Sequence, residues 1–150
     1  MSAFFPNLSY IWIRRDDKLR QAISLWKAIQ SQRWRLDDRA TEDGAPLAFS
    51  YKAISHLHSR LIEEDKCWDR YFHEVRLSPI IVKYEDLSSS PEGVLKFVLS
   101  GLGLDFAVPP DAKLSTMQRQ YDSKSEQWLH EFNRIERAHC HEGTLAGIST

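Results

Sequence analysis

The sequence has 150 residues, of which 27% are charged and 42% hydrophobic, with a formal net charge of -1, as expected for one globular domain with a single core. This near-neutral balance excludes a global attraction to nucleic acid or to an anionic membrane, so any anion site must be local. No apolar stretch approaches the ~18 residues of a membrane-spanning helix, and the N-terminus does not read as a signal peptide. We therefore expect a cytoplasmic protein with Cys67 and Cys140 as free thiols.

The first predicted elements are a short strand and an amphipathic helix. Residues 9–13, SYIWI, are β-branched and aromatic, which indicates a buried strand. Residues 17–34 repeat apolar side chains at helical spacing, with Asp16 or Asp17 as the N-cap. The polar residues of this helix share the side opposite its apolar stripe: Asp17, Arg20, Gln21, Ser24 and Lys27.

A loop and a second helix come next. Residues 35–49 mix acidic residues with Gly44 and Pro46 and have no periodicity, so they predict a surface loop, either a substrate-binding segment or a disordered one. From Ser50 to about Val75 the pattern is helical again.

The rest of the chain predicts one more strand and two more helices. Residues 80–87, IIVKYEDL, open as a buried strand and close in polar residues. Pro91 at a first helical position predicts a helix that ends near Gly101 or Gly103. A last helix is predicted over residues 123–139, with Ser123 and Glu126 at the spacing of a capping box. We expect the two ends, residues 1–8 and 142–150, to be frayed.

The order of these elements predicts the fold class. Strands separated by helices indicate an α/β fold with parallel strands flanked by helices. Two parallel strands cannot cover themselves, so we expect the C-terminal portion of an α/β domain whose N-terminal strands are absent, or a domain that a partner chain completes. An incomplete sheet also favours association, for example as a homodimer.

The junction WIRRDDKLRQAIS, residues 12–24, is the candidate binding site. A strand end and a helix start both favour anions, and an arginine there adds a forked donor suited to phosphate. Arg15 holds that position, Ser24 lies about two turns into the helix, and Arg20 is one turn before Ser24 on the same face. The alternative is a solvated polar helix face on which the two aspartates cap the helix and pair with the arginines.

Three segments, in the same order, resemble the bacterial trehalose 2-sulfotransferase-like family of sulfotransferases. They are RRDDKLRQAISLWKAIQSQRW, IIVKYEDLSSSPEGVLKFVLSGLGL and QRQYDSKSEQWLHEF, and the match covers most of residues 10–135. The resemblance implies a partial P-loop-type sulfotransferase fold and 3′-phosphoadenosine 5′-phosphosulfate (PAPS) as the sulfate donor, with no metal. It also implies transfer of a sulfuryl group to a hydroxyl of a small carbohydrate-like acceptor such as trehalose.

The same resemblance implies roles for individual residues. Arg15 and Ser24 fall on the arginine and serine that bind the 3′-phosphate of the donor. Their separation is one residue longer than in the common eukaryotic pattern, so Arg14 is the alternative to Arg15. Tyr84 falls on a position near the adenine in cytosolic relatives, and a structural tyrosine at the strand end is its alternative reading.

The part that the family uses for chemistry is not found in this sequence. The family places its P-loop-like cradle for the 5′-phosphosulfate and its general base in an earlier region, and no glycine-rich or Lys-Ser/Thr loop after a strand precedes residue 10. The catalytic residues are therefore unassigned. A truncated or degenerate non-catalytic domain with an assembly or regulatory role is the alternative function, and an unrelated phosphate-binding module is a third. His139, Cys140 and His141 lack the distant pair that a structural zinc site needs.

Overall fold

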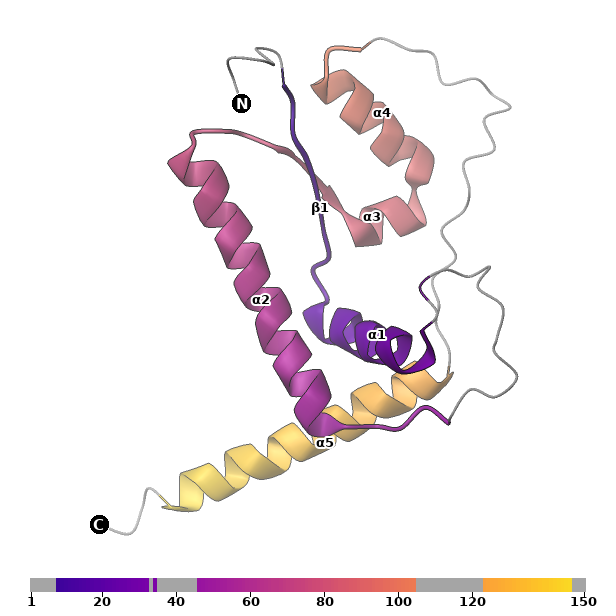
Figure 1. The fold of residues 1–150 in the computed structure, drawn as a ribbon, viewed down its shortest axis with the longest axis vertical. Coiled ribbons are helices and arrows are strands. Elements are labelled where there is room, and N and C mark those ends of the chain that lie inside the picture. Colours follow the sequence, from indigo (N-terminus) through magenta and orange to yellow (C-terminus); the bar gives the residue numbers. More distant parts are fainter. Residues whose placement is uncertain (1–7, 33, 35–45, 105–122, 147–150) are drawn as a thin grey trace. The chain divides into compact units, whose positions relative to one another are not determined.

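A computed structural model describes residues 8–32, 34, 46–104 and 123–146 of the chain, with side chains described up to residue 139. Within these residues the fold is α/β, with a two-stranded parallel sheet and flanking helices, as the sequence predicts (Figure 1). The elements in chain order are β1 (Ile11–Arg14), α1 (Lys18–Ser31), α2 (Tyr51–Glu74), β2 (Ile80–Lys83), α3 (Tyr84–Ser89), α4 (Pro91–Gly101) and α5 (Ser123–Ala146).

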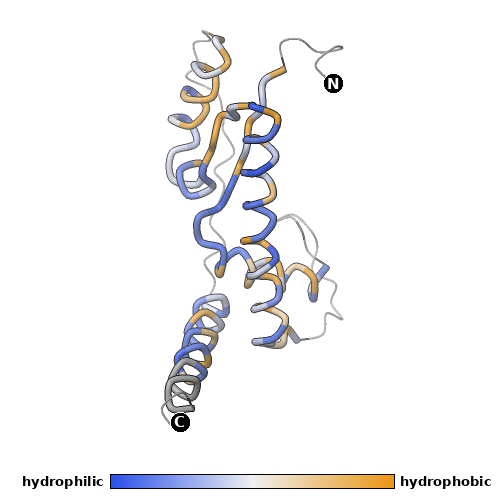
Figure 2. Tube along the Cα trace, turned by 90° about the vertical axis from the view of Figure 1, so that its left-hand side faces the viewer, coloured by the Kyte–Doolittle hydropathy of each residue, from blue (hydrophilic) through white to orange (hydrophobic). Residues whose placement is uncertain are grey.

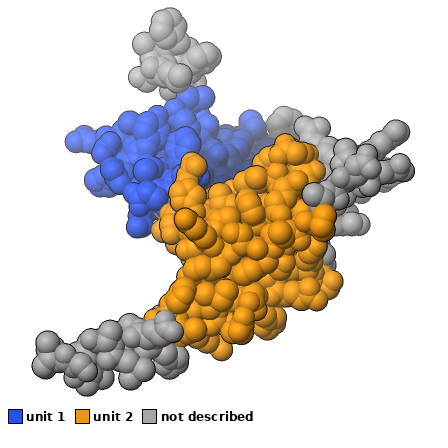
Figure 3. Space-filling view, turned by 60° about the horizontal axis from the view of Figure 1, so that its bottom comes forward, with its two compact units in different colours: residues 1–16, 63–120 blue, residues 17–62, 121–150 orange. Residues whose placement is uncertain are grey.

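The chain divides into two compact units, each made of two sequence segments (Figure 3). The sheet unit comprises residues 1–16 and 63–120, and the helical unit comprises residues 17–62 and 121–150. The long helix α2 contributes its first half to the helical unit and its second half to the sheet unit. The candidate junction, residues 12–24, is also divided, because residues up to Asp16 belong to the sheet unit and residues from Asp17 on belong to the helical unit.

The sheet unit is built on the parallel pair β1 and β2, with Ile11 opposite Ile80. Trp12 is buried on one face, where its ring lies 5.6 Å from that of Phe72 on α2. On the other face α4 packs closely on β2, because a Cβ at Gly101 would lie only 2.8 Å from Cδ1 of Ile80. One helix thus packs against each face of the pair.

Parts of the strands remain exposed in spite of these helices. Alternate residues of a strand point to opposite faces, so Ile11 and Ile13 lie on the face opposite Trp12. Their exposed fractions are 46% and 58%, and Ile81 on β2 is 46% exposed. Large aliphatic residues in a sheet are normally covered by a second layer, so these three residues are incompletely covered by the part of the chain that the structure describes.

The helical unit is held together by a cluster of buried residues from α1, α2 and α5. Partly buried side chains from the same helices and from residues 47–49 pack around the cluster. Apolar and polar residues alternate along the helices at the spacing this packing requires (Figure 2). The buried members are Ala22, Ile23, Ile54, Trp128 and Phe132.

Most predicted elements are confirmed, with small shifts at their ends. β1 begins and ends slightly later than the predicted 9–13. Asp17 is the N-cap of α1, with its carboxylate accepting a hydrogen bond from the backbone N–H of Arg20 at 2.9 Å. α1 ends at Ser31, where Gln32 adopts a left-handed conformation with φ 55°. The predicted helix after Pro91 and the predicted start at Ser123 are also observed.

Two predictions of secondary structure are wrong. The YEDL segment is not the polar end of a strand, because Tyr84 begins the six-residue helix α3 directly after β2. The helix predicted over residues 123–139 continues to Ala146. Residues 1–7 and 147–150, for which we expect fraying, and most of the predicted loop 35–49 lie outside the described residues.

Candidate functional site

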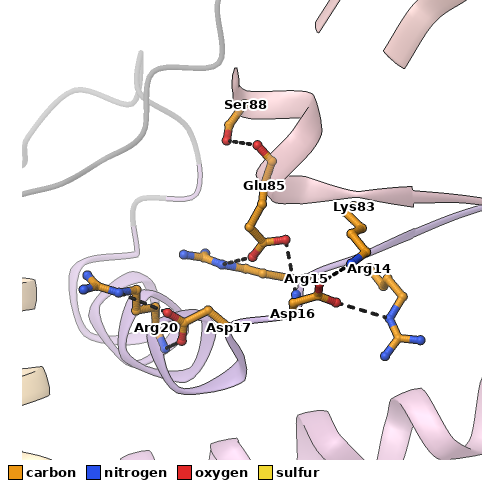
Figure 4. A network of polar contacts seen from close by, with 8 residues as sticks. All are labelled: Arg14, Arg15, Asp16, Asp17, Arg20, Lys83, Glu85 and Ser88. Carbon is orange, nitrogen blue, oxygen red and sulfur yellow. Dashed lines mark hydrogen bonds and ion pairs between the residues drawn. The ribbon is translucent and has the colours of Figure 1, made fainter. Parts of the chain in front are cut away.

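Arg15 lies immediately after β1, in the sheet unit, and Figure 4 shows its side chain beside that of Glu85. Its guanidinium also rests on the ring of Tyr84. The central carbon of the guanidinium is 4.6 Å from the centroid of Tyr84, a distance at which a cation is attracted to the face of the ring. Its Nε is buried and makes no hydrogen bond, and lies 3.9 Å from a carboxylate oxygen of Glu85. Within the described residues its terminal nitrogens make no hydrogen bond.

The topology explains why Arg15 and Tyr84 meet. Parallel strands bring their C-terminal ends to the same edge of a sheet, and Arg15 and Tyr84 are the residues that follow β1 and β2. The structure thus brings together two of the residues that the sequence predicts for the site. Their contact lies within one unit and joins segments far apart in the sequence.

Arg14 is in a different environment from its neighbour. It is the last residue of β1, on the face of Trp12, and its guanidinium carbon lies 5.0 Å from the centroid of that ring. Its Nη2 is 3.3 Å from Oδ2 of Asp65 on α2, and its Nε is 3.9 Å from Oδ1 of Asp16. Two carboxylates therefore balance the charge of Arg14 inside the sheet unit.

Lys83 is the last residue of β2 and lies at the same edge of the sheet, opposite Arg14. Its Nζ lies 2.8 Å from Oδ2 of Asp16, and the hydrogen bond to this carboxylate raises the pKa of the lysine. Asp16 thus joins the cations at the ends of both strands, and the local excess of positive charge is small.

Arg20 lies in the helical unit and joins two of its helices. Its guanidinium pairs with Glu126 on α5 through both terminal nitrogens, with Nη2 donating to Oε2 at 3.1 Å. Its Nε also lies 3.0 Å from Oδ2 of Asp17. The hydrogen bond from Arg20 lowers the pKa of Glu126. In this structure the guanidinium of Arg20 holds α5 on α1.

Ser24 is exposed on α1, one turn after Arg20, in the helical unit. Lys27, another turn along, donates a hydrogen bond from Nζ to the hydroxyl of Ser125 at 2.9 Å. The polar side of α1 is therefore not simply a solvated face, because α5 contacts part of it.

Two acidic residues beside the arginines, Glu85 and Asp65, were not predicted from the sequence. Glu85 contacts Arg15, and its Oε2 accepts a hydrogen bond from the backbone N–H of Asp16 at 3.3 Å. Asp65 pairs with Arg14 from an acidic run that reads as a solvated helix face. Glu85 could have been suspected from its place beside Tyr84, whereas nothing local to Asp65 indicates its partner.

Metal-ligand clusters and membrane-spanning helices are both absent from the described part of the chain. No group of three His, Cys, Asp or Glu side chains there could hold a metal ion. None of the helices described is long and apolar enough to cross a membrane. Of the cluster at 139–141, only the side chain of His139 is described, and its ring lies 5.4 Å from that of Tyr51.

Comparison of the sequence with known proteins shows to which family the chain belongs. The model of the Stf0 sulphotransferase family matches residues 1–135. The trehalose 2-sulfotransferase of Mycolicibacterium smegmatis is 32% identical over 124 residues, and that of Mycobacterium tuberculosis is 27% identical over 123 residues. These alignments cover 83% and 82% of this chain but 45% of each relative, so the chain spans about half the length of the curated relatives it matches. The chain therefore belongs to the Stf0 sulphotransferase family.

Proposed function

We propose that this chain provides the 3′-phosphate-binding part of a cytoplasmic, PAPS-dependent sulfotransferase that acts on a hydroxyl of a carbohydrate such as trehalose. The observation that supports this most directly is the placement of Arg15. Its planar guanidinium lies on Tyr84 at the C-terminal edge of the sheet, with terminal nitrogens that make no hydrogen bond within the described residues. A preordered fork of N–H donors suits two oxygens of one phosphate.

The two arginines differ in how well they fit this role. Arg14 is flanked by the carboxylates of Asp65 and Asp16, and an anion would have to compete with both. In the described part of the chain, the carboxylate that pairs with Arg15 is that of Glu85, at 3.9 Å from its Nε. We therefore propose Arg15 as the phosphate ligand and Tyr84 as the support that aligns it.

The other predicted ligands have different support. The assignment of Ser24 rests on the sequence resemblance, which places a phosphate-binding serine at this position. Arg20 is already paired with two carboxylates, so its use as a third donor would require it to leave Glu126. We propose Ser24 as a ligand and Arg20 chiefly as the residue that fixes α1.

The proposed reaction moves a sulfuryl group from the phosphosulfate of PAPS to an acceptor hydroxyl oxygen, while the hydroxyl proton passes to a base and 3′-phosphoadenosine 5′-phosphate (PAP) leaves. Such a transfer needs a cradle for the 5′-phosphosulfate and a positioned base. We propose that a further protein segment, on the same or another polypeptide, supplies both. The relatives are about twice as long as their match to this chain, and the exposed Ile11 and Ile13 offer such a segment a surface.

The donor site can be tested by NMR titration of the isotope-labelled chain, because NMR detects binding in the millimolar range. We expect PAP to perturb the Nε–H signal of Arg15 and to bind more tightly than adenosine 5′-phosphate, which lacks the 3′-phosphate. Arg15→Ala should abolish this preference, and Arg14→Ala should weaken it less.

The control is Arg70→Ala, because Arg70 is an exposed residue of the same unit with a 3.7 Å ion pair to Glu63. Equal binding of the two nucleotides by the unmodified chain, or a preference that survives Arg15→Ala, would contradict the proposal.

The exposed strand favours one second candidate, a non-catalytic domain that acts by assembly. It predicts association with another protein segment in which PAP binds but no sulfate is transferred. Sulfate transfer from PAPS to trehalose by the assembled protein would exclude this candidate.

A further inference from the structure

Among the residues that the structure describes, Glu85 is the one carboxylate that contacts the proposed phosphate ligand, Arg15. It lies in the first turn of α3, and its side chain is 33% exposed. One carboxylate oxygen accepts from the backbone N–H of Asp16 at 3.3 Å, and the other lies 3.9 Å from Nε of Arg15. Glu85 thus contacts both the side chain of Arg15 and the backbone N–H of the next residue, Asp16.

The short helix α3, which carries Glu85, is held by several hydrogen bonds. The hydroxyl of Ser88 donates to the backbone carbonyl of Glu85 at 2.9 Å, and the hydroxyl of Ser89 donates to that of Asp86 at 3.2 Å. The backbone N–H of Ser90 also donates to the carbonyl of Asp86, at 2.8 Å. These hydrogen bonds stabilise a helix that is too short to be stable alone. They thereby fix the backbone from which the side chain of Glu85 extends.

Arg15 is therefore restrained from two directions. Tyr84 supports the flat face of the guanidinium. Glu85 attracts the Nε side of the same group (Figure 4). Neither contact occupies a hydrogen-bond donor of the two terminal nitrogens, and within the described residues these nitrogens, like Nε, make no hydrogen bond. An arginine with one orientation loses less conformational freedom when a phosphate binds than an arginine in solvent does.

We propose that Glu85 is a positioning residue, which orients Arg15 for the 3′-phosphate and does not itself contact the nucleotide. The inference rests on the proposed function, and it explains an arrangement that is otherwise unfavourable. A carboxylate beside an anion site lowers its positive potential, but at 3.9 Å from Nε it occupies no donor on the terminal edge. This loss of positive potential is offset because an ordered Arg15 loses less conformational freedom when the phosphate binds.

Two substitutions separate the parts of this role. Glu85→Gln keeps an oxygen that can accept from Asp16 and removes the charge that attracts Arg15. Glu85→Ala removes both. Glu92→Gln is the matched control, because Glu92 forms an exposed 2.7 Å pair with Lys96 on α4 in the same unit.

The first measurement needs no ligand. Relaxation of the Nε–H signal of Arg15 reports how well its side chain is ordered. We expect an ordered signal in the unmodified chain and in Glu92→Gln, and a more mobile one in Glu85→Ala, with Glu85→Gln between them. Equal order in Glu85→Ala and the unmodified chain would overturn the inference, whatever the chain binds.

The second measurement is the ratio of the dissociation constants for adenosine 5′-phosphate and PAP. We expect Glu85→Ala to weaken PAP binding about tenfold and to leave adenosine 5′-phosphate binding unchanged, because the effect passes through Arg15. Equal weakening of both nucleotides would show a purely structural role and overturn the inference. If Arg15→Ala abolished the preference for PAP and Glu85→Ala left it unchanged, the inference about Glu85 would be overturned and the proposed function would stand. If the unmodified chain showed no preference for PAP, the proposed function itself would be contradicted.

Discussion

At the level of single residues, the end of β1 shows how two adjacent arginines acquire different roles. Arg14 is the last strand residue, so it points to the face of Trp12 and meets Asp65 of α2. Arg15 follows the strand and meets Tyr84 from the neighbouring strand end. The alternation of a strand separates the two side chains although they are consecutive.

The contact between Arg15 and Tyr84 leads to a prediction about the ring. Tyr84→Phe keeps the aromatic face, so the preference of the chain for PAP over adenosine 5′-phosphate should be unchanged. Tyr84→Leu removes the attraction of the cation to the ring, and PAP affinity should fall about two- to fivefold. The same NMR titration measures both variants. Equal losses in the two would indicate that the phenol hydroxyl, and not the ring face, is the important group.

At the level of elements, much of the secondary structure could be predicted, because helices longer than three turns show a clear apolar period and their caps are local signals. Asp17 and Pro91 are examples, and both begin helices as expected. α3 was missed because six residues are too few to show a period. Its turns are stabilised by hydroxyl groups of serines that equally suit a loop.

The sequence indicates candidate residues for the site but not their contacts. Family resemblance singles out Arg15 and Tyr84, and the parallel pairing of the strands brings them together. The ion pair between Arg20 and Glu126 could not be predicted, since the two residues are 106 positions apart. Local spacing instead suggested that Glu126 would cap its own helix with Ser123.

From the ion pair between Arg20 and Glu126 we predict that the stability of the helical unit falls at acid pH. The hydrogen bond from Arg20 lowers the pKa of Glu126, so the pair stabilises the folded chain above the unfolded pKa of about 4.3. This contribution is lost as the pH falls through the lower pKa of the folded state. Glu126→Gln should therefore lower the urea midpoint at pH 7 and flatten its decline between about pH 5 and 3.

Glu131→Gln is the control for this experiment. Glu131 pairs with Arg134 within α5, and that hydrogen bond also lowers its pKa. Because this pair joins no second helix, its loss should change the urea midpoint less. An equal change in the two variants would contradict the role of Arg20 as a link between α1 and α5.

At the level of the whole molecule, the sheet unit exposes apolar residues of the kind that a second layer normally covers. Ile13 is 58% exposed, so Ile13→Lys should leave the stability of the isolated chain within about 0.5 kcal/mol of the original. The same change should prevent association with the part of the Mycolicibacterium smegmatis relative that its alignment leaves unmatched. Co-expression followed by size-exclusion chromatography measures that association.

Ile29→Lys is the control, because Ile29 is 37% exposed on α1 in the other unit. Association should survive this change. If the unmodified chain forms a homodimer that Ile13→Lys dissociates, the exposed face of β1 serves a second copy of the chain and not a different segment.

The pairing of β1 with β2 also has a consequence for synthesis of the protein. Asp16 and Glu85, which bond across the two strand ends, are 69 residues apart. At about 5–20 residues per second, roughly 3 to 14 s separate their emergence from the ribosome. During that interval β1 presents Ile11, Trp12 and Ile13 without its partner strand, a short apolar segment of the kind that chaperones bind. Slower translation of residues 17–79 should therefore increase aggregation of the newly made chain more than slower translation after residue 90.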